Sequence, residues 1–134
     1  MSASSRRAPR YLLDTSAILA YLLNESAAGR VAALHAQAAI PFIAVGELYA
    51  ALWLKFGQAK ADEAVGVIRA WQLPWFWPTE ETVLLAGRWR AMYRLGLADS
   101  FIAALAFLAQ VPLVTKDPDF RPLQPDLQLL DLTA

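Results

Sequence analysis

The stretch "RYLLDTSAIL", residues 10–19, places an aspartate between two apolar segments. Residues 11–13 are typical of a short buried strand, and the apolar residues 17–19 continue into a helix. Asp14 lies at the junction, where the chain enters the core. A carboxylate at such a point needs a compensating partner, and the rest of the sequence indicates what that partner is.

Strand-like and helical segments alternate along the chain. Helices are expected near 16–23, 26–38, 45–56, 60–71, 79–95 and 100–110. Strands are expected at 11–13, 40–44, 73–77, 112–115 and 127–132. Gly57 and Thr79 are typical of a helix end and a helix start, and Pro74 favours an edge strand. This order predicts an α/β sandwich with a mostly parallel central sheet covered on both faces.

Length and composition indicate one globular domain over residues 11–134, preceded by a basic tail, residues 1–10, expected to be disordered. Hydrophobic residues make up 57% of the 134 residues, yet no apolar run approaches the roughly 20 residues of a membrane helix. There is no cysteine, which excludes thiolate metal sites, and with a single histidine, His35, a metal site built from histidines is not expected. We expect a cytoplasmic protein, with His35 an ordinary surface residue of its helix.

The net charge of zero does not exclude a nucleic-acid partner. Beyond residue 10 there are nine basic and twelve acidic residues, so gathering four acids in one site would leave the remaining surface slightly basic. Arg88, Arg90 and Arg94, with Lys116, are candidates for binding phosphate, although the arginines are equally consistent with a solvated helix face.

Four acidic residues are expected at one edge of the sheet. Asp14 follows the first strand, and Asp117 follows the strand "PLVT" by one residue. Glu47 is expected in the first turn of the helix after "IPFIA", and Asp99 at the start of the helix at 100–110. Because ligands of parallel sheets bind beyond the carboxyl ends of the strands, these four side chains predict a functional site.

Each acid also has an ordinary structural explanation. Asp14 or Ser16 and Asp99 could cap helices, Glu47 could complement a helix dipole, and Asp117 precedes a turn proline. Together the four negative charges would repel one another and raise their pKa values unless a cation joined them. Oxygen ligands without histidine or cysteine suit Mg²⁺, or Mn²⁺. Such an ion activates water and stabilises charge on phosphate, so phosphodiester hydrolysis is the chemistry expected.

Four segments, "LLDTSAILAYL", "FIAVGELYAAL", "GLADSFIAALA" and "PLVTKDPDF", resemble in order the acidic motifs of PIN-domain ribonucleases, and most closely the VapC toxins. The resemblance implies a three-layer α/β/α fold with about five strands and Mg²⁺- or Mn²⁺-dependent endoribonuclease activity. It also implies a homodimer inhibited by a VapB-type antitoxin of a type II toxin–antitoxin pair.

By this resemblance the four acids fall on Asp14, Glu47, Asp99 and Asp117, with Asp14 and Asp99 the firmest metal ligands. Hydroxyl positions that orient water or ligands fall on Thr15 or Ser16 and on Thr115. The segment "KDPDF" also offers Asp119, which we assign to a turn because Asp117 matches the family pattern better.

The five tryptophans have no assigned role in this scheme. Trp53 is expected in the core or at a dimer interface, because it continues a helical stripe. Trp71, Trp75 and Trp77 cluster around two prolines, where they could stack on unpaired RNA bases or pack against protein.

Other functions compete with the toxin hypothesis. A haloacid dehalogenase-type phosphatase also has an aspartate after its first strand, but its second aspartate would fall on Ser16. A stand-alone PIN nuclease in RNA processing, or a non-catalytic PIN-like binding module, would share the fold. The complete set of four acids disfavours the binding module.

Overall fold

The structure is a computed structural model, and it describes residues 8–134. Five short strands form one sheet: β1 (Tyr11–Leu13), β2 (Ala38–Pro41), β3 (Trp75–Phe76), β4 (Leu113–Thr115) and β5 (Leu129–Asp131). Six α-helices connect them: α1 (Thr15–Leu22), α2 (Ala28–Leu34), α3 (Phe42–Phe56), α4 (Gln58–Trp71), α5 (Glu80–Tyr93) and α6 (Leu97–Ala109). Two 3₁₀ helices complete the elements: η2 (His35–Gln37) and η3 (Pro118–Leu123). The predicted tail lies mostly outside the described residues.

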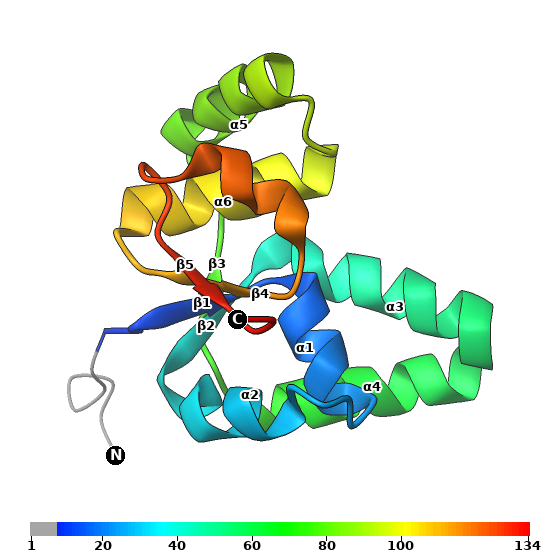
Figure 1. Cartoon of the computed structure of the whole chain (residues 1–134). Coiled ribbons are helices and arrows are strands. Elements are labelled where there is room, and N and C mark those ends of the chain that lie inside the picture. The colour runs from blue at the N-terminus through cyan, green and yellow to red at the C-terminus, as the bar shows by residue number, and fades with distance from the viewer. Residues whose placement is uncertain (1–7) are drawn as a thin grey trace.

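All strand pairs are parallel, in the order β3-β2-β1-β4-β5. Helices α5 and α6 cover one face of this sheet, and α1 to α4 lie on the other (Figure 1). The predicted three-layer α/β/α sandwich is therefore confirmed, as is the edge position of the strand after Pro74. The chain leaves β1 in one direction towards β2 and β3 and returns beside β1 as β4, so the strand order reverses between β1 and β4.

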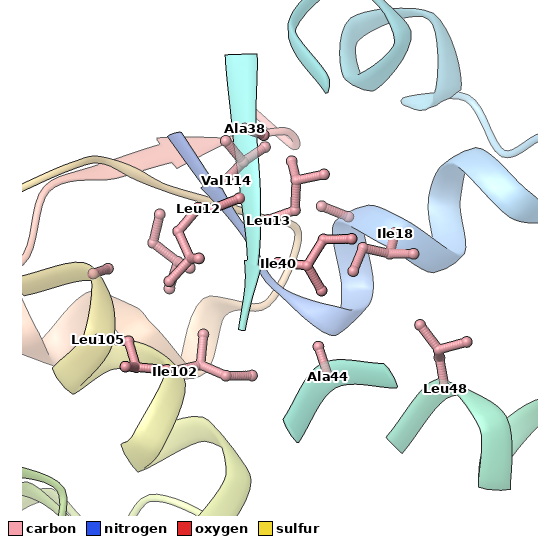
Figure 2. Packing of buried hydrophobic residues seen from close by; sticks show 14 of the residues in the cluster. Leu12, Leu13, Ile18, Ala38, Ile40, Ala44, Leu48, Ile102, Leu105 and Val114 are labelled. Carbon is pink, nitrogen blue, oxygen red and sulfur yellow. The ribbon is translucent and has the colours of Figure 1, made fainter. Parts of the chain in front are cut away.

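The core explains why the strands are apolar without alternation. Leu12 and Leu13 of β1 are both fully buried, because each faces a different helical layer. Leu12 lies on the side of Ile102 in α6, whereas Leu13 points towards Ile18 of α1 (Figure 2). A strand buried in this way leaves only its ends for polar chemistry.

Several predicted boundaries are wrong. The second strand is Ala38–Pro41 instead of 40–44, and the following helix begins at Phe42. The helix expected at 26–38 ends at Leu34 and continues as η2, and the helix expected at 100–110 begins earlier, at Leu97. Apolar runs such as residues 40–44 fit a buried strand and a buried helix equally well, so periodicity does not separate them.

No helix among residues 8–134 combines the length and apolar character needed to cross a membrane.

Candidate active site

The acidic site forms at the carboxyl rim, which we define as the edge of the sheet where the parallel strands end. Asp14 follows β1 and Asp117 lies two residues beyond β4, the two neighbouring strands between which the order reverses. This reversal creates the crevice in which parallel sheets bind ligands. The predicted placement of these two aspartates at one edge is therefore correct.

Asp14 is almost completely buried and is held by three hydrogen bonds. Its Oδ1 accepts from the Ser16 hydroxyl (2.7 Å) and from the backbone N–H of Ala17 (2.9 Å), which makes Asp14 the N-cap of α1. Its Oδ2 accepts from the Thr115 hydroxyl (2.6 Å). Burial raises the pKa of Asp14 to about 6, although these hydrogen bonds act in the opposite direction.

The hydroxyls of Ser16 and Thr115 also organise the segment after β4. The Thr115 hydroxyl accepts from the N–H of Asp117 (2.9 Å), and the Ser16 hydroxyl accepts from the N–H of Lys116 (2.9 Å). The end of β4 is thereby fastened to the start of α1, and the backbone of Asp117 is held through Thr115 relative to Asp14.

Glu47 reaches the same region from α3. Its Oε1 accepts from the Thr15 hydroxyl (2.6 Å), so a residue of α1 orients it. Glu47 lies in the second turn of α3 and not in the first as expected, because α3 begins at Phe42. A role in stabilising the helix dipole is correspondingly weak, since that effect fades beyond the first turn.

Asp99 is the residue on which the other acids converge. It lies in the first turn of α6, and the N-cap is Gly96, so the predicted capping role of Asp99 is wrong. Burial raises the pKa of Asp99 to about 7, together with the negative charges of its acidic neighbours. These neighbours are Asp117, Glu47, Asp14 and Asp119. The acids are therefore neighbours in space and are not scattered over the molecule.

Three carboxylates are close enough to share an ion. Asp99, Asp117 and Asp119 each offer an oxygen within 4.8 Å of the others, and this is the one such group among residues 8–134. Two ligand oxygens on opposite sides of Mg²⁺ are about 4.2 Å apart, so small side-chain adjustments suffice. An all-oxygen set of this kind fits Mg²⁺ or Mn²⁺. Asp14 and Glu47 lie outside this tightest group.

The PIN-domain family model matches residues 11–124 of the chain. The chain belongs to the PIN-domain family.

The fold of this PIN domain is similar to those of toxin–antitoxin complexes. DNA-bound VapBC from Salmonella typhimurium matches with a TM-score of 0.76 and 18% identity, over 92% of this chain and 98% of that one. VapBC-1 from nontypeable Haemophilus influenzae matches with a TM-score of 0.71 and 25% identity, over 92% and 98%. VapBC2 from Rickettsia felis, bound to a promoter DNA fragment, matches with a TM-score of 0.73 and 19% identity, over 90% of this chain and 97% of that one. No curated protein sequence matches the chain.

Asp119 is the residue of this PIN domain that sequence reasoning set aside. Asp117 caps η3 and accepts from the N–H of Asp119 (2.9 Å), which folds Asp119 back beside it. A turn is therefore present, as expected, but it brings Asp119 into the acidic group. The segment "DPD" could have predicted this turn, because an aspartate before proline often caps a helical turn and so brings the residue two positions later close to it.

Two of the four predicted phosphate-binding residues, Lys116 and Arg90, have side-chain partners in the structure. Lys116 forms an ion pair with Glu25, a contact that the sequence did not indicate. Arg90 donates to the carbonyl of Leu95 (3.0 Å), which fixes the segment between α5 and α6. Arg88 lies within α5 and Arg94 is its C-cap, and both residues are exposed.

His35, Trp71 and Trp53 lie in surroundings that differ from those predicted. His35 is not an ordinary surface residue: it is half-buried in η2 and packs against Tyr21 and Trp71, with ring centroids 5.8 and 5.2 Å away. Trp71 therefore belongs to the amino end of the sheet and not to the cluster expected around Pro74. Trp53 contacts Tyr49 and is 44% exposed, so it does not lie in the core. Its other predicted place, a dimer interface, stays a prediction.

Proposed function

We propose that this PIN domain is a divalent-metal-dependent endoribonuclease and the toxin of a VapC-type toxin–antitoxin pair. The observation that carries the proposal is the group of carboxylates around Asp99: burial, together with the negative charges of these neighbours, raises the pKa of Asp99 to about 7. A group that disfavours its own ionisation is stabilised when a cation binds. Without a cation, carboxylates clustered in this way would only destabilise the folded protein.

Asp99, Asp117 and Asp119 would hold the ion, and Asp14 and Glu47 would bind it directly or through water. When bound, the ion lowers the pKa of a water molecule and neutralises charge that develops on a phosphoryl oxygen. The protein's own contribution is orientation: Ser16 and Thr115 fix both oxygens of Asp14, and Thr15 fixes Glu47. Arg94, exposed where α5 ends before α6, is available for phosphate, and Lys116 would first have to leave Glu25.

The biological role rests on similarity. Several of the solved structures that resemble this fold are VapBC complexes from bacteria, which supports a VapB-type antitoxin partner for this chain. A homodimer is proposed on the same resemblance. Co-expression with the product of an adjacent small reading frame tests the partner: a stable complex that suppresses RNA cleavage is expected. Cleavage unaffected by any such partner would favour a stand-alone nuclease.

Cleavage of RNA tests the chemistry directly. The purified protein should cut RNA in the presence of Mg²⁺ or Mn²⁺ and not in the presence of a chelator. Asp14→Ala and Asp99→Ala should each abolish cleavage and leave a folded protein, whereas Asp126→Asn, at an exposed aspartate after η3, should cut at the wild-type rate. Cleavage by Asp99→Ala at the wild-type rate would refute the assignment of the site.

A further inference from the structure

Four aromatic side chains form a continuous row next to the acidic site. The rings of Trp75 and Trp77 are stacked at a centroid distance of 5.8 Å, and Trp77 stacks on Phe42 at 6.0 Å. Phe42 meets Phe101 edge to face at 5.5 Å. We call these four residues the aromatic row. Their spacing is that of favourable aromatic pairs, so the row is an ordered surface feature.

The row extends the acidic site along the carboxyl rim. Trp77 directly follows β3, and Phe42 directly follows β2, just as Asp14 directly follows β1. Because β3, β2, β1 and β4 are neighbours in that order, the rim changes from aromatic to acidic along its length. Phe101, which meets Phe42, lies on α6, the helix whose first turn carries Asp99. A chain bound along this rim would contact both parts.

The two tryptophans at the far end of the row are open to solvent. Trp77 is 64% exposed and Trp75 is 37% exposed. They flank Phe76, with Trp75 in the two-residue edge strand β3 and Trp77 directly after it, and their stacked rings lie on the same face. A hollow of about 370 Å³ beside them is also lined by Glu81. The carboxylate of Glu81 would repel a phosphate, so the hollow favours an uncharged planar group.

We propose that the aromatic row binds unpaired bases of a single-stranded RNA segment, whose backbone enters the acidic site. The proposal rests on the proposed function, because the acidic end of the rim is where the phosphodiester would be cut. Bases stack on exposed indoles irrespective of their sequence, whereas a paired base in an A-form duplex has no free face. The row would therefore make the enzyme select unpaired RNA and set the distance between the stacked bases and the cut.

Binding without cleavage provides the test. In an Asp99→Asn background, fluorescence anisotropy is measured with a labelled single-stranded RNA of mixed sequence and with the same RNA as a duplex. Trp77→Ala should weaken single-strand binding about ten-fold or more, in line with the loss of one stacked base. Trp77→Phe should retain most of the affinity, whereas Trp77→Leu, which is apolar but not aromatic, should behave like Trp77→Ala. Binding of the duplex should be weak and unchanged.

Trp53→Ala is the matched control. Trp53 is also solvent-exposed, at 44%, but it lies eleven residues from Phe42 along α3, about 16 Å from the rim. This variant should bind single-stranded RNA like the parent. Because Trp77 is largely exposed, its variants should keep the parent's melting temperature, and Trp77→Leu, which keeps an apolar side chain, provides the test should Trp77→Ala unfold.

Each remaining outcome is decisive. Equal single-strand affinity for Trp77→Ala, Trp77→Leu and the parent would overturn the proposal, even if the protein cleaves RNA. If Trp77→Ala instead changes only the oligomeric state measured by light scattering, the row is a protein interface and the proposal is wrong. Absence of RNA cleavage by the wild type, with single-strand affinity still dependent on Trp77, would refute the nuclease and support RNA binding by the row.

Discussion

Asp99 shows how one residue reports the need for a cation. Its carboxylate is half-buried and faces the negative charges of Asp117, Glu47 and Asp14, and the result is a pKa raised to about 7. Near neutral pH the folded protein therefore carries a charge that its own neighbours oppose. Such a conflict persists where function requires it, and it makes the stability of the protein sensitive to a bound ion.

Asp99→Asn should stabilise the protein in the absence of metal and remove its response to metal. At pH 8 the neutral amide relieves repulsion, which we expect to raise the free energy of unfolding by about 1 kcal/mol after allowance for solvent screening. Thermal unfolding with chelator and with millimolar Mg²⁺ measures both effects. Asp126→Asn should leave both unchanged, and an undiminished Mg²⁺ response in Asp99→Asn would contradict the role of Asp99.

Individual site residues were predictable to different degrees. The rule that parallel strands bind ligands at their carboxyl ends was sufficient for Asp14 and Asp117, because each lies within two residues of a buried strand. The rule did not predict Asp119, because its position depends on the hydrogen bond from its N–H to the Asp117 side chain at the start of η3. It also missed the pairing of Lys116 with Glu25, because a contact between loops distant in sequence leaves no local pattern.

At the scale of elements, the hydroxyls of Ser16 and Thr115 join the end of β4 to the start of α1, and that of Thr115 is the more deeply buried. Thr115 is 1% exposed, donates to Asp14 and accepts from the N–H of Asp117. Its hydrogen bond is the strongest of the influences that lower the pKa of Asp14. A single side chain thus couples a strand, a helix and the segment that carries two more acids.

Thr115→Val should loosen this junction. Valine keeps the shape but leaves a buried carboxylate oxygen and an N–H without their partner, at a cost of about 2–3 kcal/mol. The pKa of Asp14 should rise further, which NMR titration of the side-chain carboxyl can follow. Thr115→Ser keeps the hydroxyl and should lose only about 1 kcal/mol. Equal urea stability of the two variants would show that the hydroxyl does not matter.

The turn between α3 and α4 depends on backbone conformation. Gly57 ends α3 with φ +90° and ψ 170°, a region that side chains with a Cβ rarely adopt. The sequence was sufficient to predict that α3 ends here. It could not place the start of α3, because residues 42–45 are apolar and fit the end of a strand as well as the first turn of a helix.

Gly57→Ala should therefore destabilise the protein by about 1–3 kcal/mol through backbone strain, since an added Cβ meets no other atom within 4 Å. Gly66→Ala is the matched control, because Gly66 lies within α4, is exposed and also has open space around an added Cβ. There alanine should stabilise by up to about 1 kcal/mol. Denaturant unfolding of both variants would contradict this account if the two changes had the same sign.

At the scale of the whole molecule, the buried strands of the sheet form the core, whereas the candidate active site lies at the carboxyl rim. The central strands β1, β2 and β4 are largely buried between two helical layers, and the buried carboxylate of Asp14 lies at the carboxyl rim beside Asp99. Both carboxylates have raised pKa values, about 6 and about 7. The rim therefore sets how the stability of the entire fold depends on pH.

Without metal, the fold should lose stability between about pH 4 and pH 7. The unfolded chain releases these two protons near the ordinary value of 3.8, whereas the folded protein keeps them until about pH 6 and 7. In that window the folded state binds more protons, so raising the pH favours unfolding. Asp14 alone accounts for up to about 3 kcal/mol.

Saturating Mg²⁺ should reverse this trend, because the ion binds the deprotonated carboxylates of the folded state and stabilises it more as the pH rises. Urea unfolding at pH 5, 6, 7 and 8, with chelator and with Mg²⁺, measures both slopes. The double variant Asp14→Asn, Asp99→Asn removes the two titrating groups and should be nearly independent of pH and of Mg²⁺ across this range. A wild-type protein whose metal-free stability rises from pH 5 to pH 8 would show that these carboxylates are not held in the strained, partly buried arrangement from which the site is inferred.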